Sequence, residues 1–332
     1  MDLILRGVER LPDWGHGVEC ADHFLTTSGQ AGYLALGLGA LGVETEVLGN
    51  VGNDDWGARI VTDLEHGGVG VEAVEVSATS PTALCVAIAR SGDGERCFIG
   101  SMAHLGEFDN AMVERHRATL DRAEVVCVVG MFDLARFGVA GAADLLAWVR
   151  RTGKETLLDS GGDPEGWQPE TVAAIGSLLP DVSYLVVNSF EATGISGEAD
   201  PWQACAALRA LGAGSVIVKC GAEGSYGLDD SGRHRVRALD VRPADAVGAG
   251  DSYDAGFLWG LSRGLSFEQA MVTGTAAASI YVERSHDRYP GADELAAFMA
   301  SHPELAPSPA RTPYERPGSQ GPLNPKQEDS PT

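Results

Sequence analysis

The sequence predicts an α/β protein in which a mostly parallel β-sheet is covered by helices on both faces. From residue 125 onward, short continuous apolar runs alternate with longer stretches of helical periodicity. Strands without polar alternation are typical of parallel sheets whose two faces are both buried. The 332 residues are 44% hydrophobic, which is enough to form a large core and excludes global disorder. This length fits about two average domains or one large α/β domain.

The expected elements follow one another regularly along this region. The predicted strands are 125–129, 156–159, 184–187 and 215–218, and the predicted helices are 140–151, 169–179, 201–211 and 253–264. A regular alternation of strand and helix is the pattern of an α/β fold. No internal repeat is visible in the sequence.

The N-terminal third follows a different pattern. Residues 82–90 and 95–99 are β-like, and Ser91-Gly-Asp-Gly94 between them has the composition of a tight turn. These residues predict a β-hairpin that forms a small β appendage on the α/β body. Closer to the N-terminus, we expect a helix over 32–41 and a strand over 44–48.

The last segment, 303–332, contains 8 of the 16 prolines and one aromatic residue, Tyr314. A segment of this composition cannot bury enough apolar surface to offset the entropy lost on ordering. We therefore expect a folded domain over residues 1–302 and a disordered proline-rich tail over 303–332.

Composition and charge exclude several classes of partner. The chain has 24 Lys and Arg against 47 Asp and Glu, a formal net charge of −23, so its surface repels nucleic-acid backbones and anionic lipid. A local site for a small anion remains compatible with this charge. The six cysteines form no C-x-x-C pair, no signal peptide opens the sequence, and the longest apolar run, 270–282, is too short to span a bilayer. We expect a cytoplasmic protein with reduced cysteines.

One glycine motif is misleading. Gly37-Leu-Gly-Ala-Leu-Gly42 matches the dinucleotide-binding pattern G-x-G-x-x-G. That pattern must follow a strand and open a helix, whereas this run ends a predicted helix and precedes a predicted strand. Small residues that pack a helix against the sheet, with Gly42 as the helix stop, explain the run better. Walker, nucleophile-elbow and H-E-x-x-H motifs are also absent from the sequence.

The segment 245–258, Asp-Ala-Val-Gly-Ala-Gly-Asp-Ser-Tyr-Asp-Ala-Gly-Phe-Leu, carries the strongest chemical signal. Gly248, Ala249 and Gly250 open a predicted helix, and their small side chains let successive backbone N–H groups turn toward an anion. Asp251 follows at the edge of this backbone nest. It fits a general base that accepts a proton from a hydroxyl group beside a phosphate. It equally fits an N-cap of the helix.

This segment resembles the second signature of the ribokinase-like carbohydrate kinases, the phosphofructokinase B family, whose typical form is Asp-Thr-x-Gly-Ala-Gly-Asp. Further pieces resemble the family's motifs in the family's order over roughly residues 2–300. They are Ser28-Gly29, Ala35, Leu41-Gly42, Val51-Gly52-Asn53-Asp54-Asp55-Trp56-Gly57, Gly94-Glu95-Arg96, Asn188-Ser189-Phe190-Glu191 and Val218-Lys219-Cys220-Gly221-Ala222-Glu223-Gly224. The joint order of these pieces makes the resemblance strong.

The resemblance implies a central sheet flanked by helices, with a small β lid formed by about residues 3–25 and 80–105 that closes over a sugar. It implies transfer of the γ-phosphoryl group of ATP to a substrate hydroxyl, with Asp251 as base and Gly248, Ala249 and Gly250 as anion hole. It places Lys219, Gly221 and Gly224 at the nucleotide, Asn188 and Glu191 at Mg²⁺ through water, and Asp245 at a monovalent cation such as K⁺. Judged by residue type alone, Asn188 and Glu191 also fit helix capping, and Lys219 fits a solvated strand end. The family is also compatible with a homodimer formed through the lid.

The acceptor half of the site departs from the family pattern. The implied substrate residues are Asp2, Gly29, Gln30, Tyr33 and Arg96. Tyr33 stands where the family has asparagine, and it shrinks the pocket, stacks on a ring or points elsewhere. The segment 101–105 replaces a Gly-Ala-Asn type of sequence, and its His104 is expected on the surface. Glu283-Arg-Ser-His286 lacks the common Gly-Ala.

The start of the chain departs as well. Asp2 occupies the place of the family's sugar-binding aspartate, so the family's first sheet strand has no counterpart, and we expect the true start to lie upstream. The leading prediction is a sugar kinase. The alternatives are a nucleoside kinase, favoured if Tyr33 stacks on a base, and a catalytically silent ligand-binding relative.

Overall fold

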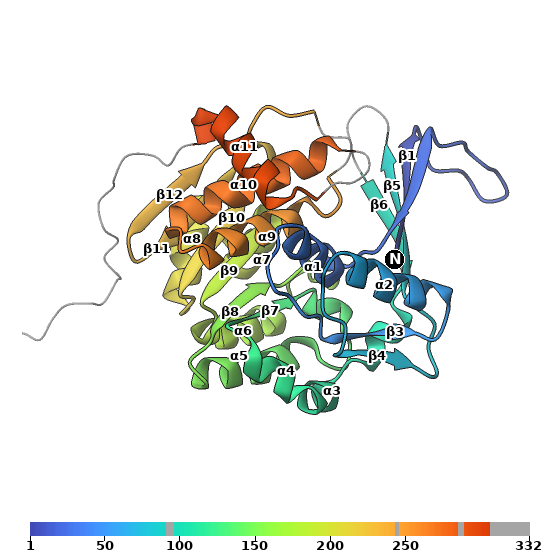
Figure 1. The fold of residues 1–332 in the computed structure, drawn as a ribbon, viewed down its shortest axis with the longest axis horizontal. Helices are drawn as coiled ribbons and strands as arrows, with labels where there is room; N and C mark the ends of the chain where they lie inside the picture. The colour runs from blue at the N-terminus through green and yellow to red at the C-terminus, as the bar shows by residue number, and fades with distance from the viewer. Residues whose placement is uncertain (91–95, 243–245, 285–288, 306–332) are drawn as a thin grey trace, which may run out of the picture.

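The main body is a six-stranded β-sheet in a computed structural model that describes residues 1–90, 96–242, 246–284 and 289–305 (Figure 1). The strand order is β12-β11-β10-β9-β8-β7. The bounds are β7 Val125–Val129, β8 Glu155–Asp159, β9 Tyr184–Asn188, β10 Ser215–Lys219, β11 Ser225–Asp229 and β12 Gly232–Val236. Strands β7 to β10 are parallel, and β11 and β12 add an antiparallel hairpin. The predicted α/β class and its four central strands are confirmed.

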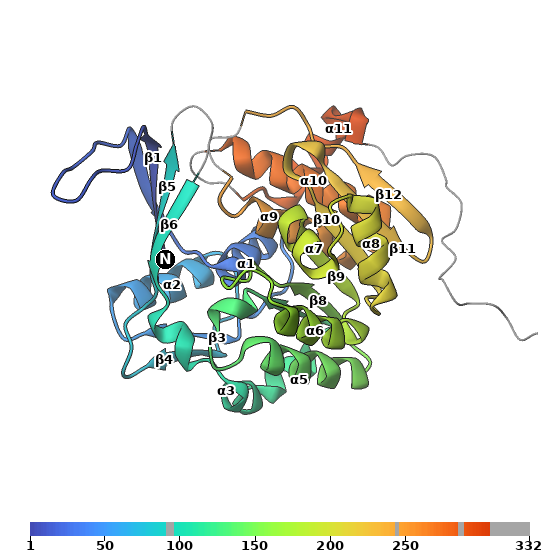
Figure 2. The same cartoon turned by 180° about the vertical axis from the view of Figure 1, so that it is seen from behind.

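Two layers of helices cover this sheet (Figures 1 and 2). One layer holds α5 Gly138–Arg151, α6 Pro169–Leu178, α7 Ser189–Ser196 and α8 Pro201–Ala210, and the other holds α1 Gln30–Ala40, α9 Ala249–Ser262, α10 Phe267–Glu283 and α11 Ala292–Ser301. Consecutive strand residues pack into opposite layers: Leu158 and Val187 lie in the first core, and Leu157 and Val186 lie in the second. The strands are therefore apolar on both faces, which is why their sequences show no polar alternation.

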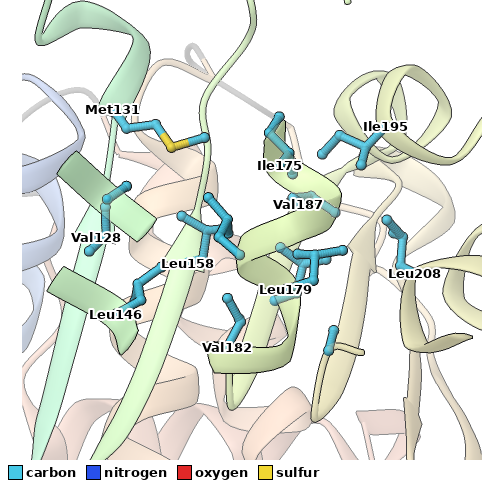
Figure 3. Packing of buried hydrophobic residues seen from close by; sticks show 14 of the residues in the cluster. Val128, Met131, Leu146, Leu158, Ile175, Leu179, Val182, Val187, Ile195 and Leu208 are labelled. Atoms are coloured by element: carbon cyan, nitrogen blue, oxygen red, sulfur yellow. The ribbon is translucent and has the colours of Figure 1, made fainter. Parts of the chain in front are cut away.

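The first core is built almost entirely from aliphatic side chains (Figure 3). Leu158 of β8 and Val187 of β9 meet Leu146 of α5 and Ile175 of α6, and all four are fully buried. Close packing of this kind fixes where each strand ends. The carboxyl ends of β8, β9 and β10 are thereby held side by side.

A small separate sheet stands beside the main body (Figures 1 and 2). Its order is β2-β1-β5-β6, with bounds β1 Asp2–Val8, β2 Asp22–Thr26, β5 Leu84–Arg90 and β6 Arg96–Ser101. The antiparallel pairing of β5 with β6 confirms the predicted hairpin, whose turn at 91–95 lies outside the described residues. On the main sheet, no described strand lies beside β7 on its outer side. The strand expected from upstream of residue 1 stays a prediction.

The predicted strand over 44–48 is wrong. The strand β3 runs from Gly49 to Gly52 and pairs with β4 Val74–Ser77, and only Glu46 forms an isolated bridge, to Gly70. The segment that faces 44–48 makes a turn between the Glu46–Gly70 bridge and the start of β4, where Val74 N donates to Val71 O. Continuous strand pairing therefore cannot form there. The remaining α-helices of the described residues are α2 Asp55–His66, α3 Asn110–Arg115 and α4 Arg117–Arg122.

The glycines at 37–42 pack helices together, as the sequence context indicates. A Cβ on Gly37 would lie 2.8 Å from the Cβ of Ala255, so the two small residues allow α1 and α9 to approach closely. Gly42 follows the end of α1 with a φ of 73°, the left-handed conformation that favours glycine after a helix. This contact fixes α1 against the helix that begins with the nest.

The C-terminal end of the described chain is packed against the body. Pro303–Leu305 form one 3₁₀ turn, and Leu305 is buried in the second core, so the packed part reaches three residues beyond 302. The rest of the predicted tail, 306–332, lies outside the described residues. In the described part of the chain, no helix is long and apolar enough to cross a bilayer.

Candidate active-site cleft

A cleft of about 2330 Å³ lies between the small sheet, α1 and the carboxyl ends of the main strands. It brings together most of the predicted site residues: Asp2, Gly29, Gln30, Tyr33, Asn188, Glu191, Lys219, Gly221, Gly224, Gly248, Ala249, Gly250 and Asp251. In an open α/β sheet, ligands bind outside the carboxyl ends of the strands. Arg96 begins β6, but its side chain lies outside what the structure describes, as do Gly94, Glu95 and Asp245.

The backbone nest forms the start of α9. Gly248 is the N-cap with a φ of 80°, and a Cβ there would lie 2.5 Å from the Tyr281 hydroxyl and 2.9 Å from the Tyr33 ring. Ala249 N makes a 3.3 Å contact with Ala246 O, while the next amides of the first turn have no acceptor within the helix. The N–H groups at this helix start and the positive end of the helix dipole together suit a phosphate group.

Asp251 does not cap the helix. The N-cap is Gly248, no side chain caps α9, and Asp251 lies within the first turn, so the capping interpretation is wrong. Its side chain is buried in the cleft wall, and burial raises its pKa to about 7, with a further contribution from the negative charge of Asp159. The Lys219 ammonium and a hydrogen bond from Gln30 oppose this rise. A carboxyl group with a pKa near neutrality is suited to general base catalysis.

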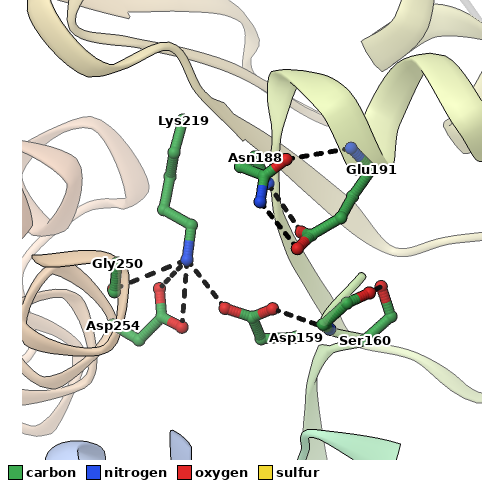
Figure 4. Close-up of polar contacts among 8 residues, drawn as sticks. Asp159, Ser160, Asn188, Glu191, Lys219, Gly250 and Asp254 are labelled. Carbon is green, nitrogen blue, oxygen red and sulfur yellow. Dashed lines mark hydrogen bonds and ion pairs between the residues drawn. The ribbon is translucent and has the colours of Figure 1, made fainter. Parts of the chain in front are cut away.

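Lys219 forms a buried ion cluster with two carboxyl groups (Figure 4). Its Nζ lies 2.8 Å from Asp159 Oδ2 and 3.0 Å from Asp254 Oδ1. Burial alone would raise the pKa of Asp159, but the ammonium group holds it below its usual value. Burial raises the pKa of Asp254 well above its usual value. Lys219 is therefore not a solvated strand end.

Sequence reasoning missed Asp159 and Asp254. Asp159 is the last residue of β8 and Asp254 lies one turn after the nest in α9. A polar residue at the carboxyl end of a predicted buried strand was the available signal for Asp159. For Asp254, the available signal was a second acidic residue one turn after the nest in a helix whose following residues are small or apolar.

Asn188 and Glu191 form a capping box at the start of α7. Asn188 Oδ1 accepts from Glu191 N at 2.9 Å, and Glu191 Oε2 accepts from Asn188 N at 2.9 Å. The two side chains also contact each other, with Asn188 Nδ2 2.6 Å from Glu191 Oε1. Burial, followed by the charge of Asp159, raises the pKa of Glu191 to about 7. The capping role is thus present, and the box faces the cleft beside Asp159 (Figure 4).

The side of the cleft formed by the small sheet and α1 is centred on Asp2. Its Oδ1 accepts from the Ser28 hydroxyl and its Oδ2 accepts from the Tyr33 hydroxyl, both at 2.7 Å. The Tyr33 ring is 4% exposed and packs among Ile4, Val247 and neighbouring aromatic rings. The face of the ring is therefore not free to stack on a base. Stacking by Tyr33, which would favour a nucleoside substrate, is not supported.

His104 is buried rather than on the surface. Only 4% of the residue is exposed, its Nδ1 accepts from Ala83 N at 2.7 Å, and its carbonyl oxygen accepts from Asn50 Nδ2 at 2.7 Å. The segment 103–107 turns inward as a 3₁₀ helix that carries His104 into the cleft wall. Burial lowers the pKa of this histidine.

The Tyr33–Asp2 bond predicts a measurable loss of stability in Tyr33→Phe. The substitution leaves a buried carboxylate oxygen without its donor, which costs about 1.5–3 kcal/mol for a hydrogen bond to a charged group. The free energy of unfolding in urea measures this loss. Tyr184→Phe is the control, because no described residue bonds the Tyr184 hydroxyl, and a change of at most about 0.5 kcal/mol is expected there. Equal losses in the two variants would contradict the prediction.

Comparison with known sequences gives one family. Residues 11–294 match the model of a family described as pfkB family carbohydrate kinase. Fructoselysine 6-kinase of Shigella flexneri is 30% identical over 243 residues, which cover 72% of this chain and 82% of that protein. 5-Dehydro-2-deoxygluconokinase of Bacillus anthracis is 24% identical over 295 residues, which cover 83% of this chain and 86% of that protein.

Comparison with solved structures gives one fold. Ribokinase of Arabidopsis thaliana, complexed with ribose and ATP, aligns with a TM-score of 0.76 at 22% identity over 90% of this chain and 95% of that chain. A protein described as ribokinase II from E. coli, in complex with ATP and Mg²⁺, aligns with a TM-score of 0.79 at 21% identity over 91% of this chain and 96% of that chain. At these identities the structures show a shared ribokinase-like fold.

Proposed function

Because the chain belongs to the pfkB family of carbohydrate kinases, we propose that it transfers the γ-phosphoryl group of ATP to a hydroxyl group of a sugar or sugar-like substrate. One observation carries this proposal. A buried carboxyl group, Asp251, follows a backbone nest at a helix N-terminus, and both line the cleft. A base next to a phosphate cradle is what direct phosphoryl transfer to an alcohol requires.

Asp251 accepts the proton of the attacking hydroxyl as the new O–P bond forms and the bond between the γ-phosphorus and the bridging oxygen breaks, so that ADP leaves with that oxygen. The nest at Gly248, Ala249 and Gly250 receives the negative charge on the transferred phosphoryl group. In other enzymes, one such donor contributes about 3–4 kcal/mol to transition-state stabilisation. No phosphorylated enzyme intermediate is needed in this scheme. The base activates the hydroxyl and the anion hole stabilises the phosphoryl group in one direct, in-line transfer.

The nucleotide half of the cleft is formed by Lys219, Gly221 and Gly224 after β10. Gly221 has a φ of 53°, and a Cβ placed on it would meet no atom within 4 Å, whereas a Cβ on Gly224 would lie 2.0 Å from Val236 O. The loop is thus tight against β12 on one side and open on the other. An open glycine backbone fits a nucleotide that lies across the strand end.

Asn188 and Glu191 provide the oxygen ligands that suit Mg²⁺, with Asp159 beside them (Figure 4). Glu191 is bonded to Asn188 through both carboxylate oxygens, so a water-mediated contact fits this pair better than direct binding. When bound, Mg²⁺ neutralises charge on the phosphate oxygens. We place a monovalent cation, such as K⁺, at Asp245 as part of the same proposal.

The acceptor binds at the small-sheet end of the cleft and next to the base, where Asp2, Gly29, Gln30 and Tyr33 line the cleft, with Arg96 proposed beside them. Both Asp2 oxygens already accept one hydroxyl each, and a carboxylate can accept further hydrogen bonds from a sugar. The small sheet is the lid over this end. Tyr33 is not available for base stacking, which favours a sugar over a nucleoside.

An acceptor panel tests the proposed function. ADP release is measured with MgATP and a set of sugars, amino-linked sugars, sugar acids and nucleosides. We expect turnover with at least one sugar-type acceptor and none with nucleosides. Turnover only with nucleosides would establish the alternative substrate class. No turnover with any acceptor, together with undiminished ATP binding, would identify a ligand-binding relative.

The pKa of Asp251 predicts the pH dependence of turnover. Because only the ionised carboxylate accepts a proton, kcat/KM should rise with pH through about 7 and fall below it. An exposed aspartate would place this limb near pH 4. The measurement is kcat/KM for the best acceptor between pH 5 and 9, on the order of ten points across the range. A flat profile between pH 5 and 8 would contradict the assignment.

We also propose a homodimer through the small sheet. Phe98 and Ile99 of β6 are 55% and 65% exposed, and β6 is the outermost strand of this sheet. Exposed apolar side chains on an edge strand are typical of an interface. Light scattering coupled to size-exclusion chromatography measures the mass in solution.

A further inference from the structure

Lys219 reaches from the main sheet to the first turn of α9 (Figure 4). Besides its ion pairs with Asp159 and Asp254, its Nζ lies 3.4 Å from the carbonyl oxygen of Gly250. The side chains of Lys219, Asp159 and Asp254 are 12%, 4% and 1% exposed, respectively. One ammonium group thus connects β8, β10 and α9 in a site that water barely reaches.

The contact concerns the part of α9 that the reaction uses. Gly250 belongs to the nest, and a Cβ placed on it would lie 3.2 Å from Lys219 Nζ, so the lysine packs directly against the nest backbone. Without this cation, Asp159 and Asp254 would be two buried carboxyl groups facing each other with no compensating charge. Breaking a buried pair in this way is strongly unfavourable.

Resting on the function proposed above, we infer that Lys219 is a positioning residue. Its ammonium group links Asp159 at the end of β8 to Asp254 in α9, and so holds the turn from Gly248 to Asp251 in the geometry that phosphoryl transfer requires. A lysine that only contacts the nucleotide would act differently, because its loss would weaken ATP binding and leave the turn in place.

The cluster also sets the electrostatic surroundings of Asp251. Among the described residues, the titratable or charged groups near it are Asp159 from β8, Lys219 from β10, Asp254 from α9 itself and Glu191 from α7 beyond Asp159. The Tyr281 hydroxyl and the ring of Tyr33 lie beside Gly248. Asp159 raises the pKa of Asp251 and Lys219 lowers it. Removing one or the other should therefore move the titration of Asp251 in opposite directions.

The test uses Lys219→Met, Asp159→Asn and the double variant in the full-length protein. We measure kcat, the acid limb of kcat/KM against pH, and MgATP affinity by calorimetry. A nearby charge moves a pKa by about 1–3 units, so we expect the limb to move up by about one pH unit in Lys219→Met and down by about one unit in Asp159→Asn. In the double variant, which removes both charges, the limb should return toward its original position while kcat stays at least about 10-fold low.

Arg209→Met is the matched control. Arg209 is also a buried cation, paired with Asp230 at 2.6 Å, but it does not line the cleft. Its loss should lower the melting temperature without moving the pH limb. Because Lys219→Met can fail to fold, Asp159→Asn and the double variant keep the test decisive.

Two results would overturn the inference. The first is a pH profile of kcat/KM whose acid limb is unchanged in Asp159→Asn and also in Lys219→Met or the double variant, whichever of these two folds. The second is a loss of MgATP affinity of more than about 10-fold in a folded lysine variant with kcat unchanged, which is the result expected for a direct nucleotide contact. Failure of the proposed function would look different, since the parent protein would then show no turnover with any acceptor, or Asp251→Asn would remain active.

Discussion

Asp251→Asn is expected to lower kcat by about 10²- to 10⁴-fold, the range that a general base contributes to catalysis. Asparagine has nearly the same size, but its amide cannot accept the proton of the attacking hydroxyl. The nest backbone is unchanged in this variant, so MgATP affinity should stay within about 3-fold of the parent value. Steady-state kinetics with the best acceptor and calorimetry with MgATP measure the two quantities.

Asp163→Asn provides a control of the same chemistry. Asp163 is as buried as Asp251, at 8% exposed, and it accepts from backbone amides of Glu165 and Trp167 outside the cleft lining. Its substitution should lower stability and leave kcat near the parent value. Near-normal turnover in Asp251→Asn would show that another group takes the proton, and the base assignment would be wrong.

Local sequence patterns were sufficient for the four parallel strands of the main sheet, whereas the hairpin of β11 and β12 was not predicted. The run Val125–Val129 becomes β7 with the predicted bounds, because its apolar side chains pack alternately against the first core, where they are buried, and the second core, where they are partly buried. The start of α9 could also be predicted locally, since Gly248 and Gly250 indicate a backbone that has no room for side chains. In both cases, the physical requirement lies within a few neighbouring residues.

The interactions that complete the site join distant parts of the chain. Lys219 is 60 residues from Asp159 and 35 from Asp254, and no local pattern relates them. Only the parallel order of β8, β9 and β10 brings the strand ends together. The hydrogen bond from the Tyr33 hydroxyl to Asp2 could not be predicted for the same reason, because it joins two elements whose residues are 31 positions apart. The sequence could suggest that Tyr33 points elsewhere, but not which group it meets.

The strand error at 44–48 has a related cause. Val47 and Leu48 are apolar and β-branched or bulky, so the segment has strand character by composition. Whether a ladder forms depends on the partner, and residues 71–74 turn away there. Pairing is a property of two segments, whereas propensity is a property of one.

Gly248→Ala is expected to abolish most activity through the nest. The residue has a φ of 80°, where an L-residue costs roughly 1–2 kcal/mol, and the added carbon would overlap the Tyr281 hydroxyl at 2.5 Å and the Tyr33 ring at 2.9 Å. Both rings are buried, so the first turn of α9 must move instead. Because loss of one anion-hole donor costs on the order of 10²- to 10³-fold in kcat, a displaced nest should lower kcat by at least about 10²-fold.

Gly264→Ala separates the backbone penalty from the displacement of the nest. Gly264 follows the other end of the same helix with a φ of 73°, and an added carbon there meets no atom within 4 Å. Its substitution carries the same conformational cost without a clash, so stability should fall while kcat stays near the parent value. If the two variants lost kcat equally, the effect would come from weakening α9 as a whole. A large loss confined to Gly248→Ala would tie turnover to the shape of the backbone immediately before Asp251.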